Sequence, residues 1–166
     1  EQAVRDIKKE YIMWPHQSYY YNGVSRNFVP FASQTYAGFS FEVLYQRVKD
    51  GKGQVVTEDP IERAIDAGEY NVLLHRDEDG LYNKFDETYE EGLVIHQSKV
   101  LVTKAPDNAD SDPETRPSET MITKTTEGSM TKYVIEPNTD TDKNNYQPTT
   151  YYYSTATKTT VNFGNT

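Results

Sequence analysis

The stretch that decides the fold spans residues 66–74 and reads Asp66-Ala67-Gly68-Glu69-Tyr70-Asn71-Val72-Leu73-Leu74. Gly68 follows an acidic turn, and from there Tyr70, Val72 and Leu74 occupy every second position. Successive side chains of a strand point to opposite faces, so this alternation predicts a β-strand that is entered from a tight turn.

Further β-rich runs flank this strand on both sides. Before it, four large apolar side chains fall on one face of another alternating run, namely Phe39, Phe41, Val43 and Tyr45. After it, residues 93–95 lead into a β-rich run over 100–106, which Pro106 closes. Three strands with turns between them predict a small β-domain.

The first eleven residues have a different spacing. Val4, Ile7 and Tyr11 lie at positions i, i+3 and i+7, with charged residues among the others. This spacing favours a short amphipathic helix that ends before Pro15. An extended segment that leads into the first strand is the alternative.

Four short motifs stand in order along the chain: Tyr21-Asn22-Gly23, residues 41–45, residues 66–72, and the run Leu101-Val102-Thr103-Lys104-Ala105-Pro106. This layout resembles bacterial immunoglobulin-like and MBG-type repeats, which open on a tyrosine–small residue–glycine turn and close on a threonine–lysine–alanine run. The resemblance implies a tandem domain of a secreted surface protein that serves as a spacer or a binding module. The fold we expect is mainly β, either an Ig-like sandwich or a β-grasp-like sheet, with a short N-terminal helix.

A change in composition predicts the domain organisation. Residues 1–106 form the repeat-like β domain, and residues 107–118 form an acidic, proline-rich linker without periodicity. Residues 119–166 are rich in Thr and Tyr, with a hairpin around the turn at 127–129 and a final alternating run over 151–163. This segment has too few apolar residues to form a good core of its own. We therefore expect it to pack on the first domain or on a neighbouring molecule.

Composition and charge exclude several classes of function. The 166 residues carry a net charge of −9, and an acidic surface repels the phosphate backbone of nucleic acids. The absence of cysteine excludes disulfides, thiolate metal sites and cysteine nucleophiles. No apolar run approaches the ~20 residues of a membrane-spanning helix. No signal peptide is visible, so we expect an exported protein to be represented here by its mature chain or an excised piece.

Two clusters of side chains are candidate binding sites. Tyr19, Tyr20 and Tyr21 could bind a glycan or peptide by stacking, although alternate members of such a triplet often belong to a core. Asp77, Asp79 and Asp86 could supply hard oxygen ligands to Ca²⁺, the one cofactor that the sequence suggests. Their spacing does not fit an EF-hand, and the alternative is a solvated hairpin turn closed by Gly80.

A covalent cross-link is a further candidate feature. Surface Ig-like domains of Gram-positive bacteria can carry an isopeptide bond, which needs a lysine that burial keeps neutral beside a protonated acid. Lys99 and Lys104 lie on or beside a predicted strand, and the sequence identifies no partner for either of them.

Catalytic motifs do not occur in the sequence. The three histidines have no metal-binding spacing, and there is no glycine-rich phosphate loop or nucleophile elbow. Pairs such as Asp77 and Asp79 imitate the two carboxylates of a glycosidase, but 26 acidic residues produce such pairs by coincidence.

The sequence therefore predicts an extracellular, cell-surface bacterial protein with a structural or adhesive role and no enzymatic activity. Its partners would be a host or cell-wall glycan or protein, or copies of itself. One alternative is a self-assembling subunit of a filament, pilus or surface layer that exchanges its C-terminal strand. Another is a glycan-binding module that uses the Tyr19–Tyr21 region.

Overall fold

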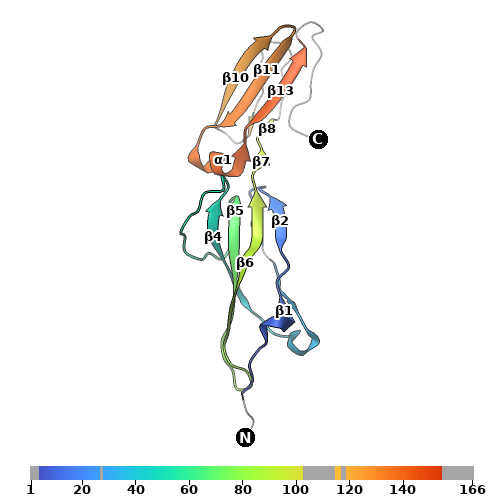
Figure 1. The fold of residues 1–166 in the computed structure, drawn as a ribbon, viewed down its shortest axis with the longest axis vertical. Coiled ribbons are helices and arrows are strands. Elements are labelled where there is room, and N and C mark those ends of the chain that lie inside the picture. Colours follow the sequence, from blue (N-terminus) through green and yellow to red (C-terminus); the bar gives the residue numbers. More distant parts are fainter. Residues whose placement is uncertain (1–3, 27, 103–114, 117–118, 155–166) are drawn as a thin grey trace. The chain divides into compact units, whose positions relative to one another are not determined.

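The computed structural model describes residues 4–26, 28–102, 115–116 and 119–154, and its contacts divide the chain into two units, Glu1–His96 and Gln97–Thr166. Each unit is built mainly from β-strands, as predicted (Figure 1). Each also contains its own hydrophobic core. No helix in the described part of the chain is long and apolar enough to cross a membrane.

Four strands form the sheet of the first unit, in the order β2-β6-β5-β4. Their bounds are β2 (Gln17–Tyr20), β4 (Glu42–Asp50), β5 (Gly68–Arg76) and β6 (Phe85–His96). β5 pairs antiparallel with both neighbours, whereas β2 lies parallel to β6 at one edge. The strand predicted within 66–74 is thus confirmed, and it lies inside the sheet.

The alternation along β5 places its apolar side chains on one face. Tyr70, Val72 and Leu74 are at most 1% exposed, while the side chains between them are partly exposed on the opposite face. Gly68 begins the strand with a φ of +153°, and a Cβ there would lie 2.3 Å from the carbonyl oxygen of Lys49. Only glycine fits that position without a shift of the neighbouring backbone.

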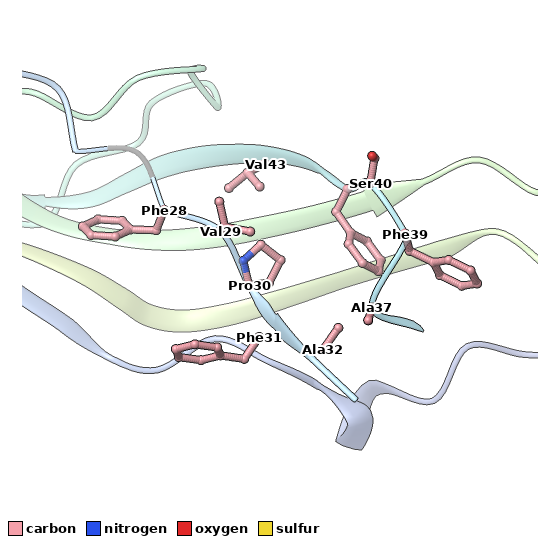
Figure 2. A pocket seen from close by; sticks show the side chains of 10 residues that line it. Phe28, Val29, Pro30, Phe31, Ala32, Ala37, Phe39, Ser40 and Val43 are labelled. Atoms are coloured by element: carbon pink, nitrogen blue, oxygen red, sulfur yellow. The ribbon is translucent and has the colours of Figure 1, made fainter. Parts of the chain in front are cut away.

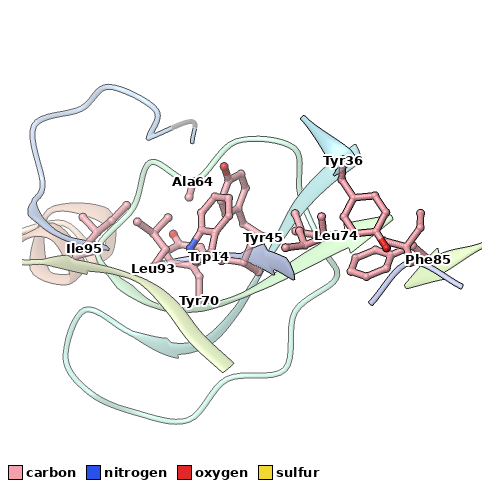
Figure 3. Close-up of a cluster of buried hydrophobic side chains, with 13 residues drawn as sticks. Trp14, Tyr36, Tyr45, Ala64, Tyr70, Leu74, Phe85, Leu93 and Ile95 are labelled. Carbon is pink, nitrogen blue, oxygen red and sulfur yellow. The ribbon is translucent and has the colours of Figure 1, made fainter. Parts of the chain in front are cut away.

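The core of the first unit lies on this face of the sheet, beneath segments from the N-terminal part of the chain (Figure 3). Those segments include two 3-10 helices and a two-stranded ribbon: η1 (Lys9–Tyr11), β1 (Ile12–Met13), β3 (Phe31–Ala32) and η2 (Gln34–Tyr36). The buried members of the core are Ile7, Ile12, Trp14, Tyr36, Tyr45, Ala64, Ala67, Tyr70, Val72, Leu74, Phe85, Leu93 and Ile95.

The predicted N-terminal helix is wrong. From residue 4 onward the segment is extended until the single turn of η1. The backbone of Arg5 pairs with a distant segment instead of with a helical turn. Its N–H donates to the carbonyl of Leu81 at 2.9 Å, and its carbonyl accepts from the N–H of Asn83 at 2.7 Å. Of the three residues that suggested a helix, Ile7 is buried, while Val4 and Tyr11 are about half exposed. The alternative, an extended lead-in, describes this segment.

β6 is a long strand whose alternation is interrupted by a bulge. Glu91 has a positive φ of 53°, and its N–H donates to the side-chain oxygen of Asn71 at 3.1 Å. Trp14 Nε1 donates to the carbonyl of Gly92 at 2.7 Å, and His16 Nδ1 lies 2.7 Å from the carbonyl of Glu91. The bulge therefore docks the incoming chain just before β2 begins to pair with β6.

The second unit contains a three-stranded antiparallel sheet in the order β10-β11-β13. Its elements are β7 (Ser98–Lys99), β8 (Leu101–Val102), β9 (Thr115–Arg116), β10 (Thr120–Glu127), β11 (Met130–Pro137), α1 (Asp140–Asn145), β12 (Tyr146–Gln147) and β13 (Thr149–Ser154). The hairpin predicted around 127–129 is confirmed by β10 and β11. A small core gathers beneath it, made of Val100, Tyr133 and Ile135 with Ile122, Tyr146 and Tyr151 against them.

The strands of the second unit pair with one another. β11 lies between β10 and β13, and β7 pairs with β12, so the described strands after His96 form sheets of their own. The division into units falls after His96, earlier than the boundary predicted at 106. The predicted linker, 107–118, lies outside the described residues except for β9, and the predicted run 151–163 is described only as far as Ser154.

Candidate functional site: an apolar groove beside the sheet

An apolar segment of the first unit reads Phe28-Val29-Pro30-Phe31-Ala32. Its N-terminal end is held by the Phe28 N–H, which donates to the Tyr45 hydroxyl at 3.3 Å, and its C-terminal end pairs with β1 as β3. Pro30 cannot donate a backbone hydrogen bond, which prevents this segment from serving as an inner strand of a sheet.

A groove of about 380 Å³ opens between this segment and the start of β4 (Figure 2). Its volume falls within the range of roughly 300–1,000 Å³ that is usual for ligand pockets. All lining residues except Ser40 are apolar; they are Phe28, Val29, Pro30, Phe31, Ala32, Ala37, Phe39, Ser40, Phe41 and Val43.

Ring contacts fix the aromatic wall of the groove. Phe39 packs edge-on against Tyr82, with ring centroids 5.0 Å apart, and Phe41 packs edge-on against Phe85 at 5.4 Å. The guanidinium carbon of Arg76 lies 4.1 Å from the centre of the Phe39 ring. Such contacts hold each ring in one orientation, so this wall is formed before any ligand arrives.

Large apolar side chains are unusually exposed on the other wall. Val29 is 85% exposed and Phe31 is 66% exposed. Met13 lies opposite Phe31 in the ribbon and is 60% exposed. A contiguous exposed apolar surface of this kind is typical of an interaction site.

The three tyrosines predicted to bind a ligand have different environments. Tyr19 stacks on Phe28 at 5.2 Å, and the guanidinium of Arg26 lies 4.6 Å from its ring centre. Tyr21 also packs against the core, whereas Tyr20 is 68% exposed. The triplet therefore alternates between packing and exposure, and only Tyr20 presents most of its ring to solvent.

The carboxylates predicted to bind calcium do not converge on one point. Asp77 and Asp86 are joined through His75, whose Nε2 lies 2.7 Å from Asp77 and whose Nδ1 lies 2.5 Å from Asp86. Within residues 4–26, 28–102, 115–116 and 119–154, no group of three or more acidic or histidine side chains is arranged to hold a metal ion. This geometry gives the calcium hypothesis no support.

Asp79 instead organises the turn between β5 and β6. Its carboxylate accepts hydrogen bonds from the N–H groups of Leu81 and Tyr82, both at 2.7 Å, and pairs with Arg76 at 2.9 Å. These contacts favour the ionised form and lower the pKa of Asp79, the N–H of Leu81 being the largest cause. The arrangement matches the alternative of a hairpin turn.

His75 is an ionisable residue that the sequence did not single out as part of this cluster. Its hydrogen bond with Asp86, and then that with Asp77, raises the pKa of the imidazole above its ordinary value. The same contact with His75 lowers the pKa of Asp86, and Lys84 contributes further. His75 and Asp86 face each other across β5 and β6, so their ion pair links the two strands.

Of the two lysines proposed for a cross-link, the structure describes only Lys99. Lys99 lies in β7 and is exposed, which removes the burial that isopeptide chemistry requires. Lys104 lies outside the described residues.

Another pocket, also of about 380 Å³, surrounds the bulge in β6. It is lined by Lys9, Trp14, His16, Thr88, Tyr89, Glu90 and Gly92. Trp14 and His16 already bond the carbonyls of the bulge, and Lys9 lies over the ring of Tyr89 and pairs with Glu87 at 3.5 Å. The polar groups of this second pocket therefore hold the chain that leads into β2. We place the functional site at the apolar groove instead.

The sequence does contain a signal for the groove, which the alternation of apolar residues in strands does not reveal. Residues 28–32 are entirely apolar, yet Pro30 lies at their centre. An apolar run that proline excludes from an inner strand must either cover a core or remain exposed.

Comparisons of the chain with protein-family models, with curated proteins and with solved structures find no match.

Proposed function

We propose that this chain is a non-catalytic module of an extracellular bacterial surface protein, with a structural or adhesive role, and that the apolar groove is its contact surface. The resemblance to immunoglobulin-like and MBG-type repeats suggested this class of protein, and the mainly β fold is consistent with it. The Ig-like sandwich remains part of the proposal.

One observation carries the adhesive role. The chain has a mean hydropathy of −0.84, yet Val29 and Phe31 present most of their side chains to water on one side of a groove with a pre-formed aromatic wall. Exposed apolar area is unfavourable at roughly 25 cal/mol per Å², so covering this surface with a partner would be favourable. The groove suits apolar side chains of a protein partner better than a hydroxyl-rich glycan.

Retention of protein-coated beads on surfaces bearing matrix proteins or cell-wall glycans tests this proposal. Val29→Lys places a charge on the groove and should lower retention on the protein surfaces at least about tenfold, as removal of an interface hot spot does. Val55→Lys is the matched control, because Val55 is 79% exposed and does not line the groove.

Retention on glycan surfaces that depends on Tyr20 and ignores Val29→Lys would instead favour the glycan-binding alternative. Tyr20→Ser is the informative variant for that alternative, since the ring is 68% exposed and its loss leaves no core cavity. Equal retention of the Val29→Lys and Val55→Lys variants on every protein surface would contradict the adhesive role of the groove.

A further inference from the structure

The outer edge of β4 is covered along its second half and open at its start. Tyr45 and Ile61 exchange two backbone hydrogen bonds, both of 2.8 Å, on the side away from β5. Bonding alternates along an antiparallel strand, so Val43, two residues earlier, points its N–H and C=O to the same outer side. Among the described residues, no backbone group bonds Val43 there.

The facing segment has an open edge as well. Ser33 donates to the carbonyl of Tyr11 at 3.0 Å, and Phe31 lies opposite Met13. By the same alternation, the N–H and C=O of Ala32 point away from β1. Ala32 and Val43 both line the groove, so the groove combines apolar walls with unpaired backbone groups. An extended strand with apolar side chains at alternate positions satisfies both features.

This chain contains a segment with that pattern. Residues 157–163 read Thr-Lys-Thr-Thr-Val-Asn-Phe, so Val161 and Phe163 fall on one face of an extended strand. The segment has one lysine and no acidic residue, in a chain of net charge −9 whose Glu42 adjoins Val43. Opposite charges therefore favour the encounter.

The partner strand of this C-terminal run ends before the segment begins. β13 pairs with β11 as far as Ser154 opposite Met130, and Met130 is the first residue of β11. The described pairing of β13 with β11 therefore stops at Ser154.

Chain reach favours a second molecule as the source of the segment. In the second unit, β7 and β12 pair directly after the link at Gln97, and Ser154 lies seven residues beyond Gln147, roughly 20 Å at ~3.3 Å per residue. In the first unit, Val43 lies in line with Glu87, nine residues before His96, or roughly 30 Å along β6. Both lie far from the link, so a segment from a second molecule can reach the groove without any particular arrangement of the two units.

We propose that the groove and the open edge at Val43 receive residues 157–163 of a second copy of this chain, which adds as a strand beside β4. The inference rests on the proposed function, because it assigns an occupant to the same groove. The two contact surfaces differ, so the contact is head-to-tail and can propagate from molecule to molecule.

Sedimentation of the full chain between about 1 µM and about 1 mM tests this contact. The average mass should rise with concentration. Val29→Lys in the groove and Phe163→Ser in the segment should each weaken association at least about tenfold. The control Val55→Lys should stay within about twofold of the unchanged chain, a difference well below 1 kcal/mol. An equimolar mixture of the two weakened variants keeps one intact groove and one intact segment, so it should form a one-to-one dimer and stop there.

A monomeric mass at every concentration would overturn the proposal, and so would association that Val29→Lys and Phe163→Ser leave unchanged. A chain ending at Ser154 that binds a synthetic peptide of residues 155–166, while the full chain is monomeric and does not, would assign the segment to its own molecule. The adhesive role has a separate test: bead retention that depends on Val29 in a strictly monomeric protein would retain that role and remove the second copy.

Discussion

At the scale of single residues, His75 makes a pH-dependent contact in the first unit. It lies between Asp86 and Asp77, and these two hydrogen bonds favour the imidazolium. A group whose pKa is raised by folding stabilises the folded state at low pH. The contribution is complete below the ordinary imidazole pKa of about 6.5 and is lost as pH rises through the raised value.

The first prediction follows from this sign. The unchanged chain should exceed His75→Gln in free energy of unfolding below about pH 6, and the difference should shrink as pH rises past the raised pKa. Urea titrations across pH 5 to about pH 9 measure it. In a parallel NMR titration, Asp86→Asn should lower the pKa of His75, whereas Asp59→Asn, an exposed acid elsewhere, should not. A His75 pKa that ignores Asp86→Asn would contradict the account.

At the scale of elements, the bulge in β6 depends on Gly92. A Cβ at this position would lie 2.8 Å from Val72 Cγ2 and 2.9 Å from Trp14 Cδ1. Both neighbours belong to the core, where side chains have little room to move. Gly92 therefore permits Trp14 to approach β6 and bond its backbone.

The second prediction is that Gly92→Ala lowers the free energy of unfolding by about 1–3 kcal/mol, the usual cost of overpacking a core. Gly80→Ala is the control, because a Cβ there meets nothing within 4 Å. It should change stability by less than about 0.5 kcal/mol. Denaturant unfolding measures both, and equal stability of the two variants would show that the bulge does not require glycine.

The elements that could be predicted from the sequence are those whose local residue pattern matches the conformation that the backbone adopts. β5 follows its period of 2 throughout, and the β10–β11 hairpin turns at Gly128, whose φ of +62° suits glycine. The full length of β6 was not predicted, because the bulge around Glu91 interrupts the alternation: Tyr70 pairs with Leu93 and Val72 with Tyr89, so β6 advances four residues where β5 advances two. Helix α1 was also missed, because its sequence is wholly polar and its start depends on the Thr139 cap, which accepts from Asp142 at 3.1 Å.

The groove was harder to predict than the strands. It is assembled from residues 28–32 and 37–43, and its form depends on long-range ring contacts such as Phe41 with Phe85. Local periodicity carries no information on such contacts.

The tyrosine triplet, in contrast, could be assessed from the local sequence. The alternative, in which alternate members belong to the core, agrees with the packing of Tyr19 and Tyr21 and the exposure of Tyr20.

At the scale of the whole molecule, the two units have separate hydrophobic cores. Trp14, the only tryptophan of the chain, lies in the core of the first unit. Tyr133 lies on β11, in the core of the second unit, and is fully buried. These two residues allow the units to be followed separately.

The third prediction is that Tyr133→Ala destabilises only the second unit. Truncating a buried aromatic side chain typically costs about 3–5 kcal/mol. The far-ultraviolet circular dichroism of the variant should therefore show an early partial transition, while the fluorescence of Trp14 keeps its original midpoint. If both signals shifted together, the two units would unfold as one cooperative structure.

The contact surface is the central claim at this scale, and hydrogen exchange at the Val43 amide tests it most directly. In dilute full-length protein this amide should exchange rapidly, because its N–H points to the open edge of β4. In concentrated protein its exchange should slow by at least about tenfold as a strand from a second copy pairs with it, while the Tyr45 amide, already bonded to Ile61, stays protected at both concentrations. Exchange at Val43 that is equally fast, or equally slow, at every concentration would contradict the account.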